Sequence, residues 1–189
     1  MALPRLIVIC GATATGKSDL AIELAKAIDG EIINADSMQL YRGMDIGTAK
    51  LSVSERRDVP HHMLDILNVS EDASVAQYQT LARDAIDDIH QRGRAAIIVG
   101  GTGLYIKSII DEMNFPETDP DLRARLEAEA EDLGTAHLYA RLQLQDPEAA
   151  QAIEAANTRR IIRALEVIEV TGKQYSANLP SDTSLRYPD

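Results

Sequence analysis

The residues from Gly11 to Ser18 carry the clearest chemical signal in the sequence. They match the phosphate-binding pattern G-x-x-x-x-G-K-[ST] in full. Glycines in such a loop let backbone N–H groups turn inward around an anion, and a following helix adds its positive N-terminus. Lys17 would contact phosphate oxygens, and the Ser18 hydroxyl would bind Mg²⁺. We predict that a diphosphate or triphosphate is bound by Gly11, Ala12, Thr13, Ala14, Thr15, Gly16, Lys17 and Ser18.

The surroundings of this P-loop favour a phosphate site over a plain glycine-rich turn. An aliphatic run, Leu6 to Cys10, precedes it, and apolar residues at helical spacing follow it up to Ile28. The motif alone does not separate ATP hydrolysis, phosphoryl transfer and the use of some other diphosphate, because fold and motif do not settle function.

A carboxylate, Asp36, follows the second predicted strand, Glu31 to Ala35. Ligands of open α/β sheets bind at the carboxyl ends of the strands, so we expect Asp36 to lie near the P-loop. There it could bind Mg²⁺ through water or act as a general base. The alternative is an aspartate that only caps a turn.

Other candidates are weaker on sequence alone. The run Gly100 to Gly103 follows a strand, and its glycines either admit a ligand close to the backbone or simply make a tight turn. The pair His61 and His62 could be catalytic or structural. Arg123 could be an ordinary solvated helix charge.

The charge distribution is uneven. The net charge of −11 argues against nucleic-acid binding, and residues 117–154 hold ten acidic residues against three arginines. A basic cluster, Arg159, Arg160 and Arg163, follows directly. It either forms a local cationic patch or pairs along its own helix, for example with Glu166.

Strands alternating with helices in the first part of the chain predict a parallel sheet covered on both faces. We therefore expect a P-loop NTPase-like, three-layer α/β/α core over residues 1–115, with an α-helical insertion over 116–175 and a loop-like tail over 176–189. The strands are expected at Arg5 to Cys10, Glu31 to Ala35, His62 to Ile66 and Ala95 to Val99. The insertion is expected to hold about four helices, at 119–133, 135–144, 146–155 and 157–171.

Several classes are excluded or disfavoured. Cys10 is the single cysteine, so no internal disulfide forms, and the histidines lack zinc-ligand spacing. The N-terminal aliphatic run is far shorter than the roughly 20 residues of a membrane helix and has no signal-peptide cleavage site. We expect a cytoplasmic protein without membrane contact, and take a monomer as the working expectation.

Six ordered motifs together resemble the tRNA dimethylallyltransferase (tRNA isopentenyl transferase) family. The resemblance spans residues 5 to about 175. The motifs occupy residues 11–18, 36–41, 43–50, 59–66, 99–105 and 159–167.

The resemblance implies transfer of a dimethylallyl group from dimethylallyl diphosphate to N6 of the adenosine 3′-adjacent to the anticodon in tRNA. It implies that the P-loop and Mg²⁺ hold the donor's diphosphate and that Asp36 is the base. It places Thr102 and Arg123 at family positions that assist at the reacting centre or the RNA. By the same resemblance, tRNA is contacted by Asp36, Ser37, Met38, Gln39, Arg159, Arg160, Ile161, Ile162 and Arg163.

The sequence departs from the family pattern in two respects. Ala12 stands where many bacterial tRNA-modifying members have proline, and the related adenylate isopentenyltransferases often have alanine. Family members also continue well beyond this length, so the resemblance implies a C-terminally truncated chain whose activity alone is open. The alternatives are an isopentenyltransferase acting on free AMP, ADP or ATP, a P-loop small-molecule kinase, and a phosphate-binding module without catalysis.

Overall fold

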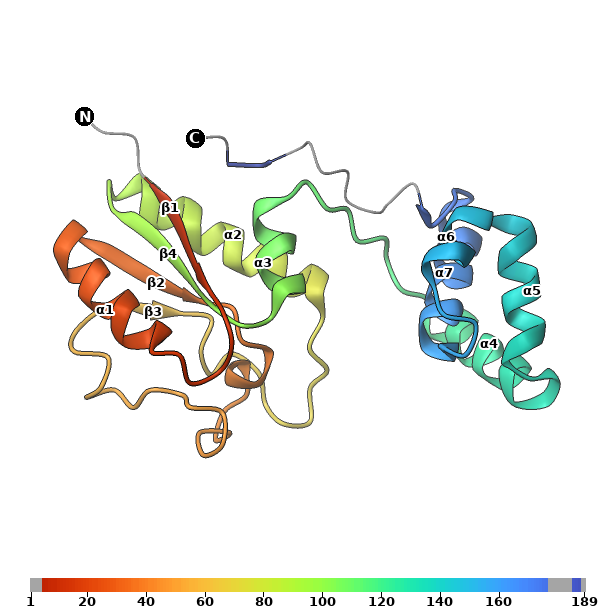
Figure 1. Cartoon of the computed structure of the whole chain (residues 1–189), viewed down its shortest axis with the longest axis horizontal. Helices are drawn as coiled ribbons and strands as arrows, with labels where there is room; N and C mark the ends of the chain where they lie inside the picture. The colour runs from red at the N-terminus through yellow and green to blue at the C-terminus, as the bar shows by residue number, and fades with distance from the viewer. Residues whose placement is uncertain (1–4, 177–184, 188–189) are drawn as a thin grey trace. The chain divides into compact units, whose positions relative to one another are not determined.

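The computed structural model describes residues 5–176 and 185–187. Its chain divides into two compact units. The core unit comprises Met1–Glu112 with Thr183–Asp189, and the helical unit comprises Met113–Asp182. The helical unit thus begins slightly before residue 116, where the sequence places it (Figure 1).

The core unit is built on a parallel sheet of four strands in the order β1-β4-β2-β3. Every residue of β2 and β4 is buried, including the polar Glu31 and Asn34 of β2, and burial on both faces explains the continuous apolar character of β4. The strands are β1 Leu6–Cys10, β2 Gly30–Asn34, β3 His61–His62 and β4 Ala95–Gly100.

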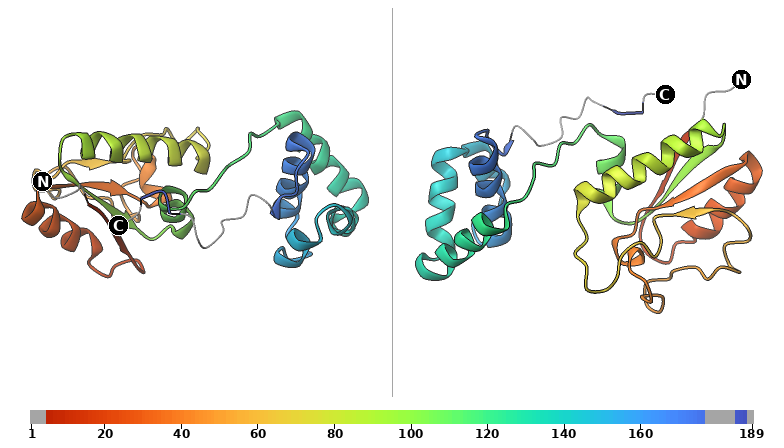
Figure 2. Two further views of the ribbon diagram at one scale, coloured as in Figure 1. Left: turned by 90° about the horizontal axis from the view of Figure 1, so that it is seen from above. Right: turned by 180° about the vertical axis from the view of Figure 1, so that it is seen from behind.

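Helices cover both faces of this sheet. Helix α1, Lys17–Ile28, packs on one face through Ile22 against Ile32 and Ile97. Helices α2, Val75–Gln91, and α3, Gly103–Ile110, pack on the other face, and Figure 2 shows α1 and α2 on opposite sides of the strands. The predicted three-layer α/β/α architecture is confirmed.

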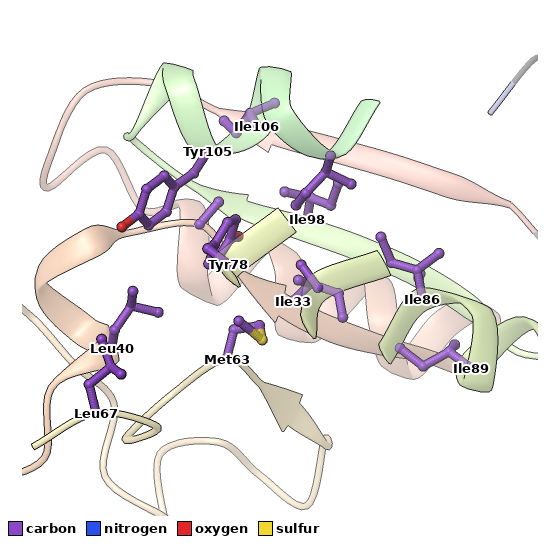
Figure 3. Packing of buried hydrophobic residues seen from close by; sticks show 14 residues of the cluster. Ile33, Leu40, Met63, Leu67, Tyr78, Ile86, Ile89, Ile98, Tyr105 and Ile106 are labelled. Carbon is purple, nitrogen blue, oxygen red and sulfur yellow. The ribbon is translucent and has the colours of Figure 1, made fainter. Parts of the chain in front are cut away.

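The larger of the two core clusters of this unit lies between the sheet and helices α2 and α3 (Figure 3). The rings of Tyr78 and Tyr105 stack there with centroids 4.1 Å apart. The Tyr78 hydroxyl donates a 2.7 Å hydrogen bond to the backbone oxygen of Asn34, the last residue of β2. This bond ties the end of the strand to α2. A short 3-10 helix, η1 Ser37–Leu40, follows β2.

The strand predicted over His62 to Ile66 is wrong in extent, because β3 contains only His61 and His62. The backbone turns left-handed at Met63, with φ 60°, and at Asp65, with φ 56°. A β-strand does not continue through such residues, so β3 ends at His62, and the segment after it lies beside η1, where the Leu67 amide donates a 3.0 Å hydrogen bond to the Leu40 oxygen.

The helical unit contains no strand between residues 117 and 173, all of which the structure describes. Its core consists of leucines, isoleucines and alanines from all its helices, among them Leu126, Leu138 and Leu165. Asp119, Asp146 and Asn157 cap helix N-termini with their side chains. The helices are α4 Pro120–Leu133, α5 Thr135–Gln145, α6 Pro147–Ala152 and α7 Thr158–Thr171.

Part of the predicted loop-like tail belongs to the core unit. Leu185 forms a β-bridge with Asp111, and the Arg186 amide donates a 2.8 Å hydrogen bond to the Ile110 oxygen. Tyr187 packs against the core cluster. The rest of that tail, 177–184 and 188–189, lies outside the described residues. Among the helices that the structure describes, none is long and apolar enough to cross a bilayer.

Candidate active site

A cavity of about 260 Å³ opens in the core unit beside the P-loop. Because β2 and β4 are parallel neighbours, their carboxyl ends meet here and bring residues far apart in sequence into one wall. The wall contains Thr13, Ala14, Thr15, Gly16, Lys17, Ser18, Asp19, Ala21, Ile32, Asn34, Asp36, Gln39, Thr48, Ala49, Leu51, His61, Leu64, Val99, Gly100 and Gly101.

The conformation of the P-loop depends on a left-handed glycine and on two side-chain hydrogen bonds within the loop. Gly16, with φ 78°, caps α1 in a left-handed conformation that a glycine adopts without strain. The ammonium of Lys17 and the hydroxyl of Thr15 donate to the Ala12 carbonyl at 2.5 and 2.9 Å. Two N–H groups of Lys17 therefore remain for a ligand. Gly11 and Ala12 themselves are not part of the cavity wall.

Asp36 lies in the same cavity wall and also caps a turn. Its Oδ1 accepts a 2.9 Å hydrogen bond from the Met38 amide. The neighbouring Asn34 holds the Asp36 backbone from both sides: its Oδ1 accepts from the Asp36 amide at 3.2 Å, and its Nδ2 donates to the Asp36 oxygen at 3.0 Å. Nδ2 also donates to the Met63 oxygen at 2.9 Å. Sequence reasoning missed Asn34, because nothing local marks a strand-end amide as a clamp.

Thr102 contacts the segment that carries Asp36. Its Oγ1 accepts a 3.2 Å hydrogen bond from the Ser37 amide, and its own amide donates to the Ala35 oxygen at 3.1 Å. Gly100 is required by this close approach, since a Cβ at Gly100 would lie 2.2 Å from the Ala35 oxygen. The absence of a side chain at Gly100 therefore accommodates the protein's own backbone.

The segment after η1 forms another part of the wall. The Gln39 side chain donates a 2.8 Å hydrogen bond to the Thr48 oxygen. Lys50, whose side chain is buried, pairs with Asp65 at 2.7 Å and Asp45 at 2.9 Å. Burial alone would lower the pKa of Lys50, but these carboxylates raise it. Lys50 thus stays charged and fixes the segment, a contribution that the sequence analysis did not identify.

The adjacent histidines His61 and His62 have different surroundings. His61 lines the cavity, with Nδ1 2.7 Å from the Val59 oxygen, and burial lowers its pKa. His62 instead lies 2.6 Å from the buried carboxylate of Glu31. The structural interpretation therefore applies to His62.

Arg123 and Arg163 belong to the helical unit, where both pair with the buried carboxylate of Glu166. The Arg123 Nη2 lies 2.7 Å from Glu166 Oε2, and the Arg163 Nη1 lies 2.8 Å from the same oxygen. The pairing of Arg163 within its helix, weighed as an alternative from the sequence, is present.

The remaining residues of the predicted tRNA segment differ in exposure. Arg159 and Arg160 are exposed, and their side chains make no hydrogen bond or ion pair with any residue that the structure describes. Ile161 and Ile162 are 0% and 6% exposed and pack in the core of the helical unit. Their side chains support the helix from inside and are not available to an RNA.

Ser18 and Asp36 provide oxygen atoms to the cavity, and oxygen is the ligand type that Mg²⁺ prefers. Within residues 5–176 and 185–187, no three His, Cys, Asp or Glu side chains are grouped as a metal site. An Mg²⁺ would need only one or two protein oxygens here, because this ion usually takes its other ligands from substrate phosphates and water.

A family model described as IPP transferase matches residues 39–188. The chain belongs to the IPP transferase family. The P-loop and Asp36 precede the matched segment, whereas Gln39 is its first residue and Thr102 and the basic cluster of Arg159, Arg160 and Arg163 lie within it.

The chain aligns over nearly its whole length with two tRNA dimethylallyltransferases. It is 60% identical over 95% of its length to a tRNA dimethylallyltransferase of Streptomyces griseus, and 56% identical over 98% to one of Thermobifida fusca. The chain spans 57% and 60% of those two proteins.

Two solved structures of transferases that act on tRNA are also similar to this chain. A eukaryotic dimethylallyltransferase acting on tRNA is similar with TM-score 0.83 and 32% identity, over 97% of this chain and 46% of that one. The full-length tRNA isopentenylpyrophosphate transferase of Bacillus halodurans is similar with TM-score 0.59 and 48% identity, over 90% of this chain and 57% of that one.

Proposed function

We propose that the protein transfers a dimethylallyl group from dimethylallyl diphosphate to N6 of the adenosine 3′-adjacent to the anticodon in tRNA. The names of its relatives support this class of reaction. The observation that carries the proposal is that the P-loop and Asp36 line one cavity. A leaving diphosphate and an attacking amine need an anion site and a base within reach of one another.

The anion site takes the diphosphate of the donor. Backbone N–H groups of the P-loop, the N-terminus of α1 and the free N–H groups of Lys17 stabilise the charge that develops on the leaving pyrophosphate. The allylic C–O bond breaks as the bond between N6 and that carbon forms, and pyrophosphate departs with the bonding electrons.

Asp36 takes the proton that N6 must lose. Its Oδ1 is held by the Met38 amide, and Asn34 fixes its backbone, so Oδ2 is available at a defined position. An exocyclic adenine amine is a weak nucleophile, and a positioned carboxylate removes the positive charge that would otherwise build up on it.

Mg²⁺ would be held by the Ser18 hydroxyl and by phosphate oxygens, where it neutralises charge on the diphosphate. Ser18, in the first turn of α1, would contribute one oxygen ligand. The remaining stabilisation of the leaving group comes from Lys17 and the loop amides.

The tRNA would be held at two places. Residues 36–39 contact the target adenosine, which must leave its stack to enter the cavity. The exposed Arg159 and Arg160 bind phosphates of the anticodon stem-loop, because their guanidinium groups are not engaged within the described fold.

The substitution Asp36→Asn tests the mechanism in a protein extended to the full length of its relatives. Transfer of labelled dimethylallyl to tRNA should fall by about 10²-fold or more, while binding of the diphosphate donor stays within about twofold. Asp19→Asn is the matched control, because Asp19 lines the same cavity but lies on α1 beside Arg57. Near-normal turnover by Asp36→Asn would refute Asp36 as the base.

The acceptor is tested in the same assay. Label on tRNA supports the proposal, whereas label only on free AMP, ADP or ATP would assign the protein to nucleotide prenylation. Transfer of the γ-phosphate of labelled ATP to an acceptor would instead identify a kinase.

A further inference from the structure

Glu166 is a buried carboxylate on α7 that no part of the proposed reaction uses directly. Its side chain is 0% exposed. Oε1 accepts a 3.0 Å hydrogen bond from the Asp119 amide at the start of α4, and Oε2 accepts from Arg123 and Arg163. Burial raises the pKa of Glu166, but these partners bring it below its usual value, so the group is ionised.

The two arginines use this carboxylate differently. Both terminal nitrogens of Arg163 already have partners within the protein: its Nη1 binds Glu166, and its Nη2 donates a 2.7 Å hydrogen bond to the Pro116 oxygen. Arg123 uses only one Nη2 bond within the part of the chain that the structure describes, and its side chain is 40% exposed. A guanidinium has five N–H donors, so most of those of Arg123 remain open.

An isolated exposed arginine samples many rotamers and loses that freedom when it binds an anion. A buried carboxylate that binds one edge of the guanidinium already restricts its rotamers, so less conformational entropy is lost when the arginine binds an anion. Buried ion pairs are weak evidence for stability, because desolvation offsets much of their attraction. The unequal use of the two arginines indicates a role beyond stability.

We propose that Glu166 is a positioning residue for Arg123: it holds one edge of the guanidinium and leaves the other N–H donors for a phosphate oxygen of the bound tRNA. This inference rests on the proposed function. It assigns Arg163 to anchoring the 116–117 segment against α7. It also separates Arg163 from the freely exposed Arg159 and Arg160.

The test is a double-mutant cycle in the protein extended to the full length of its relatives, with labelled dimethylallyl diphosphate and tRNA. Glu166→Gln should lower kcat by about tenfold, because the neutral carboxamide offers one acceptor oxygen in place of two and holds Arg123 less firmly. In an Arg123→Ala background the same substitution should cost less than about twofold, since the residue it positions is gone.

Glu169→Gln is the matched control. Glu169 lies on the same helix and pairs with Arg125 and Arg141, so its loss also removes an ion-pair hub but leaves Arg123 untouched. It should change kcat by less than about twofold in both backgrounds. Glu166→Asp keeps the charge while withdrawing the carboxylate, and serves in the same cycle if Glu166→Gln does not fold.

Equal losses from Glu166→Gln with and without Arg123 would overturn the positioning role, as would an unchanged kcat in Glu166→Gln when Arg123→Ala is impaired. Absence of any transfer by the parent protein would overturn the proposed function, and this inference with it. Melting temperatures of each variant identify losses of activity that come only from unfolding.

Discussion

The close approach of β4 to the end of β2 makes Gly100 a test of the site's architecture. A Cβ at this position would lie 2.2 Å from the Ala35 oxygen, 2.3 Å from its carbonyl carbon and 2.8 Å from its Cα. All three are backbone atoms, so no side-chain rotation relieves the clash. The substitution Gly100→Ala must therefore push the two strand ends apart by about 1 Å.

The cost can be worked from these contacts. Overpacking a tight site costs about 1–3 kcal/mol, and occasionally more. The displacement also strains two hydrogen bonds, from the Ala35 amide to the Val99 oxygen at 2.7 Å and from the Thr102 amide to the Ala35 oxygen at 3.1 Å. Each contributes about 1 kcal/mol. We expect Gly100→Ala to lower the free energy of unfolding of the core unit by about 3–5 kcal/mol, and its Tm by roughly 12–20 °C.

The assay is hydrogen exchange of the peptides that contain the amides of Ala35 and Thr102, combined with thermal unfolding. A loss of about 3 kcal/mol corresponds to roughly 10²-fold faster exchange when opening is global. Gly101→Ala is the matched control, because a Cβ there meets only the Gly11 oxygen, at 3.5 Å. If Gly100→Ala were as stable as Gly101→Ala, the steric reasoning would be refuted.

Three further predictions concern charge. Arg159→Ala or Arg160→Ala should each weaken tRNA binding and reduce its salt dependence by about one unit of slope, measured by binding at several ionic strengths. Arg163→Ala should instead lower the Tm and leave the slope unchanged, because its guanidinium binds Glu166. Burial of Glu31 raises its pKa, but Arg92 and its other partners lower it from 4.5 to about 2. The ionised Glu31 therefore contributes about 3 kcal/mol above pH 4.5, and urea unfolding should show this contribution disappear as the pH falls toward 2.

Local patterns were sufficient for most of the elements. The aliphatic run before Gly11 and the helical spacing after it predicted β1 and α1, and the alternation of strands and helices predicted the layered core. The P-loop could be identified because its chemistry depends on residues that are adjacent in sequence. The position of Asp36 near the P-loop could be expected as well, since parallel strands place their carboxyl ends at one edge of the sheet.

Other features follow from contacts between residues far apart in sequence. The strand order puts β4 between β1 and β2, and only that order makes Gly100 meet Ala35. The apolar spacing over residues 157–171 favours burial of Ile161 and Ile162, which the structure confirms, whereas the resemblance implied that these two residues contact tRNA. The left-handed turns that shorten β3 carry no glycine signal, because the residues there are Met63 and Asp65.

The sequence by itself determined the elements, the P-loop and the kind of chemistry, because those depend on short-range spacing and residue type. Only the tertiary structure decided how polar groups far apart in sequence are shared: that Thr102 accepts a hydrogen bond from the Ser37 amide next to Asp36, and that Glu166 holds Arg123 as well as Arg163. Hydrogen-bond partners across 40 or more residues depend on register and packing, and these arise only when the whole unit has folded.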